Sequence, residues 1–221
     1  MRKALEIGGF VAAAVLIVFG VVAIVMGVNG RQTVNKNLSN EYIVGTPDMT
    51  PSAIKAEAQK AGIASKVTLW PTQSVANQKI DSGSKARLMA EYMRIHTLEA
   101  TQGYTYSQMG IYQAKPGTPK SQLMPGGGTD NTTYAAIDPT TKQPIQNGPR
   151  QVWVSETALT TALNMSYMAD QLGLFGIVVG IALLLTGIGF AILAIGGALE
   201  NPRTLSFRSG SKSKVPAVPV A

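Results

Sequence analysis

Cysteine is absent from this chain of 221 residues, and histidine occurs once, as His96. Without cysteine, the chain has neither a disulfide framework nor a metal site built on thiolate ligands. A serine hydrolase needs an activating base and often a Gly-x-Ser-x-Gly elbow; the elbow is missing and His96 is the one imidazole available. The composition therefore leaves few routes to catalysis.

Charge is also scarce, at 14% of residues against 45% hydrophobic, and two runs lack it entirely. These runs are 7–28 and 172–199, of 22 and 28 residues. A helix needs about 20 apolar residues to cross the hydrocarbon core, so each run predicts a transmembrane helix. A cleaved signal peptide is the alternative for the first run, but its apolar core exceeds the usual length of roughly 7 to 15 residues, which favours an uncleaved anchor.

The positions of basic residues predict a topology. The tail 200–221 carries four basic side chains, Arg203, Arg208, Lys212 and Lys214. Basic segments next to membrane helices usually remain in the cytoplasm, so both the N-terminus (1–6) and the tail are expected there, with residues 29–171 outside the plasma membrane. We expect the tail to be disordered and to contact anionic lipid. The outer region has no basic cluster interleaved with aromatic residues, so nucleic acid is not an expected partner.

Glycine forms a stripe along the second apolar run, as Gly173, Gly176, Gly180 and Gly187. Small residues let helix backbones approach closely in lipid, and Gly176 and Gly180 form a GxxxG pair. The stripe therefore predicts a helix partner, which could be the first span, another copy of the chain or a different membrane protein. The alternative is that glycine is simply common in membrane helices.

The region between the spans, 29–155, is expected to form a small extracytoplasmic α+β domain. Thr50 as N-cap and Pro51 at the first helical position predict a helix over about 51–61, which Gly62 ends. From about 156 to 199, apolar residues at helical spacing continue into the second span without a breaker, and they predict one long helix with a membrane-proximal part.

A further helix and three strands complete the expected domain. The helix lies within 84–103 and ends at Gly103; its apolar face holds Leu88, Tyr92, Ile95 and Leu98 at spacings of three and four. The strands are expected at "EYIVG", "KVTLW" and "RQVWVS", of which the last is rich in β-branched and aromatic residues.

Three segments carry a resemblance: "IVGTPDMTPSAIKAEA", "EYMRIHTLEATQGYTYSQMG" and "RQVWVSETALTTALNMSYMADQLGLFGIVVGIALLL". They resemble a family of uncharacterised actinobacterial two-span membrane proteins, some of which are labelled aromatic ring-opening dioxygenases. The resemblance implies a plasma-membrane location and brings no catalytic residues. A non-heme iron site of that kind typically needs two histidines and a carboxylate. Since the chain has one histidine, we reject that label for it.

One weak polar site is suggested on the second predicted helix of the domain. Tyr92, His96 and Glu99 are spaced to share a face, and a contact between His96 and Glu99 would make a proton-responsive or weakly metal-binding position. The alternative is a structural role for the same three residues. Five carboxylates, Glu99 among them, show no pattern that selects a catalytic pair: Glu91, Glu99, Asp130, Asp138 and Glu156.

These observations predict a non-catalytic membrane protein of the cell envelope with no cofactor and no assigned metal. It would act as an accessory or scaffold subunit, docked by its glycine stripe into a membrane assembly or a self-oligomer. The alternatives are an extracytoplasmic module that binds lipid or cell-wall fragments near Trp70 or Trp153, and an enzyme of unfamiliar design. Convergence of two or more of Glu91, His96, Glu99 and Asp138 in one cleft would favour the enzyme.

Overall fold

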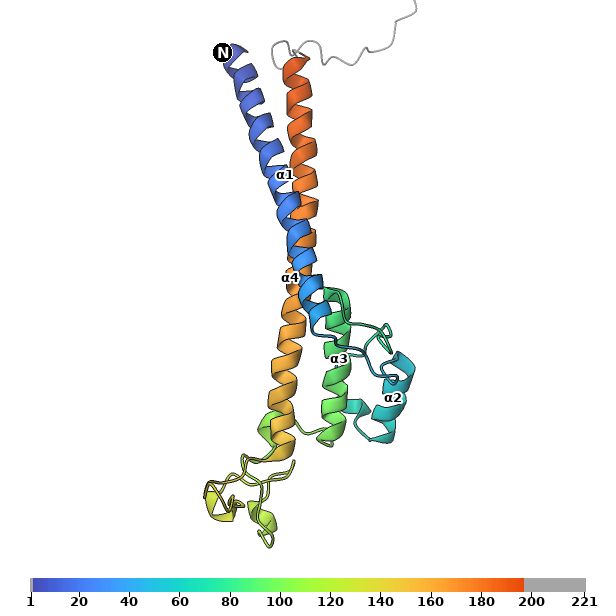
Figure 1. The fold of residues 1–221 in the computed structure, drawn as a ribbon, viewed down its shortest axis with the longest axis vertical. Helices are drawn as coiled ribbons and strands as arrows, with labels where there is room; N and C mark the ends of the chain where they lie inside the picture. Colours follow the sequence, from blue (N-terminus) through green and yellow to red (C-terminus); the bar gives the residue numbers. More distant parts are fainter. Residues whose placement is uncertain (1, 197–221) are drawn as a thin grey trace, which may run out of the picture. The chain divides into compact units, whose positions relative to one another are not determined.

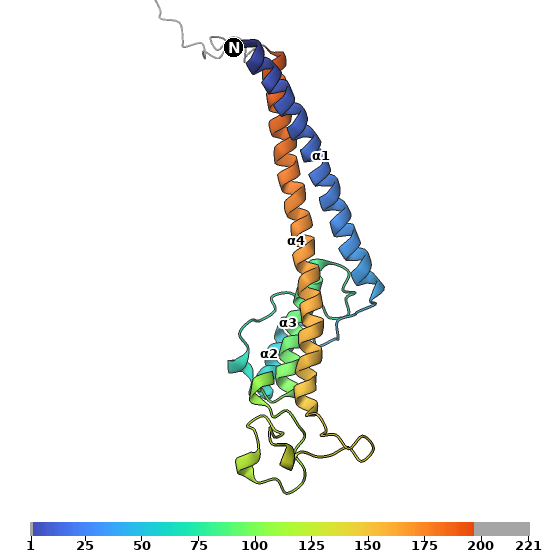
Figure 2. The ribbon, with the colours of Figure 1, turned by 90° about the vertical axis from the view of Figure 1, so that its left-hand side faces the viewer.

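The structure, a computed structural model, describes residues 2–196 and is helical over most of that length (Figures 1 and 2). It divides into two units, one made of the described residues up to Gly27 and from Phe175 onward, the other of Val28–Leu174. The helices in chain order are α1 (Arg2–Asn40), α2 (Pro51–Lys60), η1 (Ala64–Lys66), α3 (Gly83–Ala100), η2 (Tyr106–Gln108), η3 (Lys120–Gln122), η4 (Thr132–Tyr134) and α4 (Gly148–Ile195).

Helices α1 and α4 are both long and apolar enough to cross a membrane. Their large apolar side chains in the unit up to Gly27 and from Phe175 are mostly exposed, including Phe19 and Leu185. The core helix of a soluble protein would bury such side chains, whereas a lipid-facing helix exposes them. The composition, length and exposure therefore agree with the predicted apolar spans. The predicted end of the second span, at 199, lies outside the described residues.

Glycines bring the backbones of α1 and α4 together in this unit. A Cβ added to Gly180 would lie 2.7 Å from the Gly20 carbonyl oxygen, and one added to Gly20 would lie 2.8 Å from that of Gly180. A Cβ on Gly187 would meet the Ala13 carbonyl oxygen at 3.0 Å. Gly176 is less crowded, since its nearest atom in α1 would be the Ala23 carbonyl oxygen at 3.6 Å. Gly176, Gly180 and Gly187 of the stripe thus face the first helix of the same chain.

The expected α+β domain is wrong, because the described residues contain no strand. Residues 28–174 form a helical unit with six isolated β-bridges, such as Val44 with Lys79 and Tyr112 with Thr129. The segment "EYIVG" contributes only single bridges, and "KVTLW" begins inside the 3-10 helix η1. The first run forms bridges at Val44 and Gly45 to two different positions and the second forms none, so neither extends into a ladder.

The third expected strand, "RQVWVS", is instead part of α4, which begins at Gly148 and not near 156. Pro149 suits the first turn of a helix because the N–H that proline lacks would be unpaired there. Trp153 then shares one helical face with Glu156, Thr160 and Leu163, all buried. Burial on this face outweighs the β-propensity of the segment, which is a weak and context-dependent preference.

The two short helices predicted from capping signals are confirmed. At α2, the Thr50 hydroxyl accepts a hydrogen bond from the Ala53 N–H, and Gly62 ends the turn with a positive φ of 70°. At α3, Gly103 has a φ of 77° and donates its N–H to the Leu98 carbonyl. Both ends need the left-handed conformation that glycine adopts without strain.

The core of the 28–174 unit lies between α2, α3 and the first part of α4. Helix α3 contributes more of it than any other helix, and its buried residues include Ala86, Ala90, Tyr92, Ile95 and Leu98. At Gly83, an added Cβ would lie 2.5 Å from the Asp170 Cβ, so α3 approaches α4 closely at its start. The Asp170 carboxylate is buried and accepts a hydrogen bond of 2.9 Å from Arg31 Nε. This ion pair ties the end of α1 to α4 within the unit.

The glycine contact predicts the effect of a bulky residue at one position. Gly180→Leu should separate α1 from α4, because its Cβ would overlap the backbone of α1 near Gly20. The native chain has no cysteine, so the double substitution Ala23→Cys and Gly176→Cys introduces one pair of thiols. A short thiol cross-linker should join this pair within a single chain. Gly180→Leu should prevent this cross-link.

Gly189→Leu is the matched control, because an added Cβ there meets nothing within 4 Å. It should leave the intramolecular cross-link intact. A cross-link that persists with Gly180→Leu, or one that forms mainly between two chains, would contradict the pairing of α1 with α4.

Tyr92 predicts a dependence of stability on alkaline pH. Its hydroxyl donates to the Gln73 carbonyl at 3.0 Å, and burial, with a smaller effect of Glu91, raises the pKa of the phenol above its ordinary value of 10.0. Because the pKa is raised, the stabilisation that the protonated Tyr92 hydroxyl gives to the folded state is complete below pH 10.0. It is lost as the pH rises through the raised pKa. Tyr92→Phe should lower the free energy of unfolding by about 1 kcal/mol near neutral pH, yet make stability fall less steeply in strong alkali.

Thermal unfolding in detergent, measured at one pH near neutral and at one pH above the ordinary phenol pKa, tests this prediction. Tyr42→Phe is the control, because that side chain is exposed. Equal alkaline sensitivity in Tyr92→Phe and the unchanged protein would refute the assignment.

Candidate functional site

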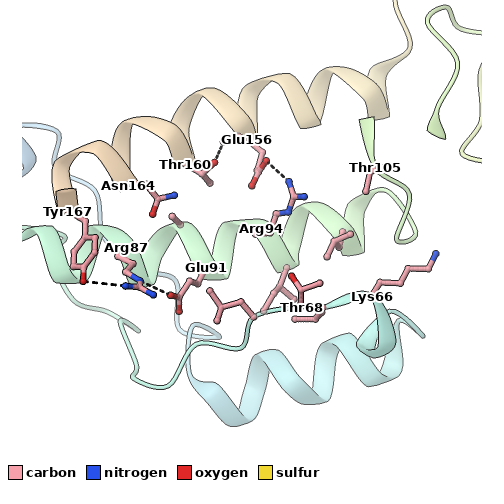
Figure 3. A pocket seen from close by; sticks show the side chains of 15 residues that line it. Lys66, Thr68, Arg87, Glu91, Arg94, Thr105, Glu156, Thr160, Asn164 and Tyr167 are labelled. Carbon is pink, nitrogen blue, oxygen red and sulfur yellow. Dashed lines mark hydrogen bonds and ion pairs between the residues drawn. The ribbon is translucent and has the colours of Figure 1, made fainter. Parts of the chain in front are cut away.

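A groove with a volume of about 680 Å³ lies in the 28–174 unit, between α3, the first part of α4 and the segment 66–69 (Figure 3). We refer to it as the α3–α4 groove. Its apolar lining comes from Val67, Leu69, Ala90, Ile95 and Leu98, and its polar lining from Lys66, Thr68, Arg87, Glu91, Arg94, Thr105, Glu156, Thr160, Asn164 and Tyr167.

A partly buried ion pair joins the two helices across the groove. Arg94 Nη1 of α3 donates to Glu156 Oε2 of α4 at 3.3 Å, as the dashed line in Figure 3 marks. The Glu156 side chain is only 3% exposed, whereas that of Arg94 is 50% exposed. The carboxylate therefore lies at the floor of the groove, and the guanidinium retains a face toward solvent.

Aromatic packing fixes the position of Arg94. Its guanidinium carbon lies 4.0 Å from the centroid of the Trp153 ring, within the range of a cation–π contact. Trp153 is itself buried, and its indole N–H donates to the Tyr104 carbonyl at 2.7 Å. Arg94 is thus held by a carboxylate on one side and by an anchored ring on the other.

A second guanidinium lies toward the other end of the groove. Arg87 Nε pairs with Glu91 at 3.2 Å, and its Nη1 donates to the Tyr167 hydroxyl at 3.2 Å. The hydrogen bond to Tyr167 raises the pKa of Arg87 above its ordinary value, and the hydrogen bond to Glu91 adds a smaller effect in the same direction. Arg87 is therefore a permanent cation, and close to half of its side chain is exposed.

The lining of the groove combines charged and apolar side chains. Three cations (Lys66, Arg87 and Arg94) face two carboxylates (Glu91 and Glu156), which leaves one positive charge in excess. Half-exposed guanidiniums can donate to a carboxylate or phosphate of a ligand, while the apolar lining can contact a hydrocarbon or ring portion. Both carboxylates are already engaged in ion pairs.

Of the four residues whose convergence would have indicated an enzyme, His96 and Glu99 lie beside each other on α3, but the four do not meet in the α3–α4 groove. Glu91 lines the groove, but His96, Glu99 and Asp138 do not. Asp138 caps a turn through the N–H groups of Thr140 and Thr141, which also lower the pKa of its carboxyl.

The weak polar site predicted on α3 is brought together in part. His96 Nδ1 lies 3.9 Å from Glu99 Oε2, whereas Tyr92 is buried in the core and donates to Gln73. On its other side, His96 Nε2 lies 3.3 Å from Asp48 Oδ2, a neighbour from outside the helix that the sequence did not suggest.

The remaining predicted residues belong to the glycine stripe and to the tail. Gly173 of the stripe is buried. The tail residues Arg203, Arg208, Lys212 and Lys214 lie outside the described residues.

Sequence reasoning missed the pairing of Arg94 with Glu156. In the sequence, Glu156 is one of five carboxylates without a selecting pattern, and the segment before it has the composition of a strand. Read as a helix, the spacing of Trp153, Glu156 and Thr160 places all three on one face. That spacing is the signal that could have found the pair.

Comparisons with protein-family models, with curated proteins and with solved structures find no match to this chain.

The ion pair predicts a compensating pair of substitutions. Arg94→Ala should lower the free energy of unfolding by about 2 kcal/mol, because Glu156 then remains buried without its cationic partner. Adding Glu156→Gln to this variant should restore most of that loss, since a neutral amide costs less to bury. Thermal unfolding of the single and double variants in detergent measures both effects. A double variant no more stable than Arg94→Ala would contradict the pairing.

Proposed function

We propose that this protein is a non-catalytic membrane protein of the cell envelope whose 28–174 unit binds an anionic, partly apolar molecule in the α3–α4 groove. The observation that carries the proposal is the groove itself, in which the Glu156 side chain is buried, that of Glu91 is 12% exposed and both guanidiniums are about half exposed. Its volume of about 680 Å³ lies within the range of roughly 300–1,000 Å³ that small-molecule sites occupy.

Charge arrangement favours an anionic ligand. A carboxylate or phosphate approaching Arg87 and Arg94 would meet guanidinium N–H groups that the protein already holds in place through Tyr167 and Trp153. Pre-positioned donors lose little side-chain entropy on binding, which strengthens an ion pair. A cationic ligand would have to displace these guanidiniums from their carboxylate partners.

The ligand class that fits both linings is an envelope lipid or lipid fragment. Its charged headgroup would bind to the guanidiniums, and its apolar portion would lie against Val67, Leu69 and Leu98. A cell-wall fragment with a carboxylate shares the polar half of this chemistry and lacks the apolar half. The apolar lining therefore favours the lipid.

The proposal places the 28–174 unit outside the plasma membrane and both termini in the cytoplasm. Its support is the length and apolar character of α1 and α4, together with the basic residues of the tail.

A scaffold role through the glycine stripe stays a prediction with less support than ligand binding. Gly180 and Gly187 contact Gly20, Ala13 and Ile17 of the same chain, so this face of α4 is already occupied. Docking to another subunit would have to use a different face of either helix.

Binding can be tested on the full-length protein in detergent, with lyso-phosphatidylglycerol as the lipid probe and N-acetylmuramyl dipeptide as the cell-wall probe. We expect the lipid to bind more tightly and to protect Arg87 and Arg94 from modification. Arg87→Gln should weaken binding by about 10- to 150-fold, since one charge-assisted hydrogen bond contributes roughly 1.5–3 kcal/mol. Asn164→Trp should block the groove from α4.

Lys120→Gln is the matched control, because it removes an exposed cation outside the groove. Equal losses with Arg87→Gln and Lys120→Gln would show only nonspecific attraction to anions. Tighter binding of the dipeptide would move the ligand class to the cell wall, and binding of neither probe would overturn the proposal.

A further inference from the structure

Three metal-ligating side chains meet on the α2 side of α3. Asp48 comes from the loop before α2, Glu57 from α2 and His96 from α3, and one ligand atom of each lies within 4.8 Å of the others. The three come from separate segments of the chain, so their meeting is a product of the fold. The sequence spacing of 48, 57 and 96 gives no recognisable motif.

The imidazole nitrogen at the centre of this group lacks a hydrogen-bond partner. His96 Nε2 is buried and neither accepts nor donates a hydrogen bond, although Asp48 Oδ2 lies 3.3 Å away. Leaving a buried polar atom without a hydrogen bond is costly, and in native proteins such an atom can mark the position of a bound ion. A lone pair on Nε2 facing a carboxylate oxygen is unfavourable unless a proton or a metal ion lies between them.

The surroundings of the other imidazole nitrogen also suit a bound ion. Glu99 Oε2 lies 3.9 Å from Nδ1, on the side away from Asp48. Histidines that bind metals usually donate their second N–H to a carboxylate or carbonyl, which fixes the tautomer and directs the lone pair to the metal. Glu99 is placed to hold the Nδ1 proton in this way with a small side-chain adjustment.

One distance within the group is close to that between two ligands of a metal ion. Two ligands bonded to Zn²⁺ at about 2.0–2.2 Å lie roughly 3.4 Å apart in a tetrahedral arrangement. The separation of 3.3 Å between His96 Nε2 and Asp48 Oδ2 matches this spacing. The buried residues Ile54 and Ala58 of α2 and Ile95 of α3 hold the two helices that carry Glu57 and His96.

We propose that Asp48, Glu57 and His96 bind a divalent transition-metal ion of the Zn²⁺ type, with Glu99 as a positioning residue for the imidazole. One imidazole and two carboxylates suit Zn²⁺ or Mn²⁺ better than Mg²⁺ or Ca²⁺, which prefer oxygen ligands alone. About a third of the Asp48 and His96 side chains is exposed, which leaves access for the ion and for water ligands. This site is separate from the α3–α4 groove, so either proposal can fail alone.

The single histidine makes the test unambiguous, because all imidazole signals in an NMR spectrum come from His96. The full-length protein, purified in detergent without a histidine tag, is titrated with Zn²⁺. We expect the imidazole signals to shift, to saturate at one equivalent and to return on addition of a chelator. Mg²⁺ should leave them unchanged.

Conservative variants test the other ligands. Asp48→Asn and Glu57→Gln should each weaken Zn²⁺ binding by at least about 10-fold, and Glu99→Gln should weaken it by about 10- to 100-fold through the orientation of His96. Glu41→Gln removes an exposed carboxylate that is not part of the group, and it should have no effect.

A second measurement does not depend on the variants folding. In the unchanged protein, Mn²⁺ should broaden the signals of Asp48, Glu57 and His96 before those of other residues. The proposal is overturned if Zn²⁺ leaves the imidazole signals unchanged, if Asp48→Asn and Glu57→Gln bind Zn²⁺ as tightly as the unchanged protein, or if Mn²⁺ broadens other regions first.

Discussion

The close approach of two helix backbones at Gly20 and Gly180 is the contact on which the apolar unit depends. Two helices in hydrocarbon gain nothing from hiding apolar surface, because lipid is as apolar as leucine; they associate through van der Waals packing where small residues let the backbones meet. Each of these glycines would place a Cβ within 3 Å of the other's carbonyl oxygen. The glycines weaken the helix locally, and the packing that they allow is their compensation.

A different kind of interaction organises residues 28–174. There α3 is covered by α2 on one side and by α4 on another, and the two sides carry different chemistry. Toward α4, cations and carboxylates are matched in ion pairs, with Glu156 neutralised by Arg94. Toward α2, carboxylates surround the one imidazole, with Asp48 and Glu99 at its two nitrogens. The first arrangement suits an anionic ligand, and the second suits a cation.

Local signals in the sequence predicted the parts of the fold that local physics controls. The caps at Thr50 and Gly103 and the uncharged runs set helix ends and apolar spans without reference to distant residues. The segment around Trp153 could not be predicted in this way, because burial of its helical face depends on α3 and outweighs its β-propensity. For the same reason the neighbours of His96 were only half foreseen: Glu99 is one turn away on α3, but Asp48 arrives through the packing of α2.

We propose that α1 and α4 cross a membrane and that residues 28–174 lie on its extracytoplasmic side. The most direct measurement is labelling of intact cells with a membrane-impermeant maleimide, since the native chain has no cysteine to react. Ser121→Cys, an exposed position of the 28–174 unit, should be labelled in intact cells, whereas Lys3→Cys should be labelled only after the membrane is permeabilised. Labelling of Lys3→Cys in intact cells, with Ser121→Cys protected, would contradict the account.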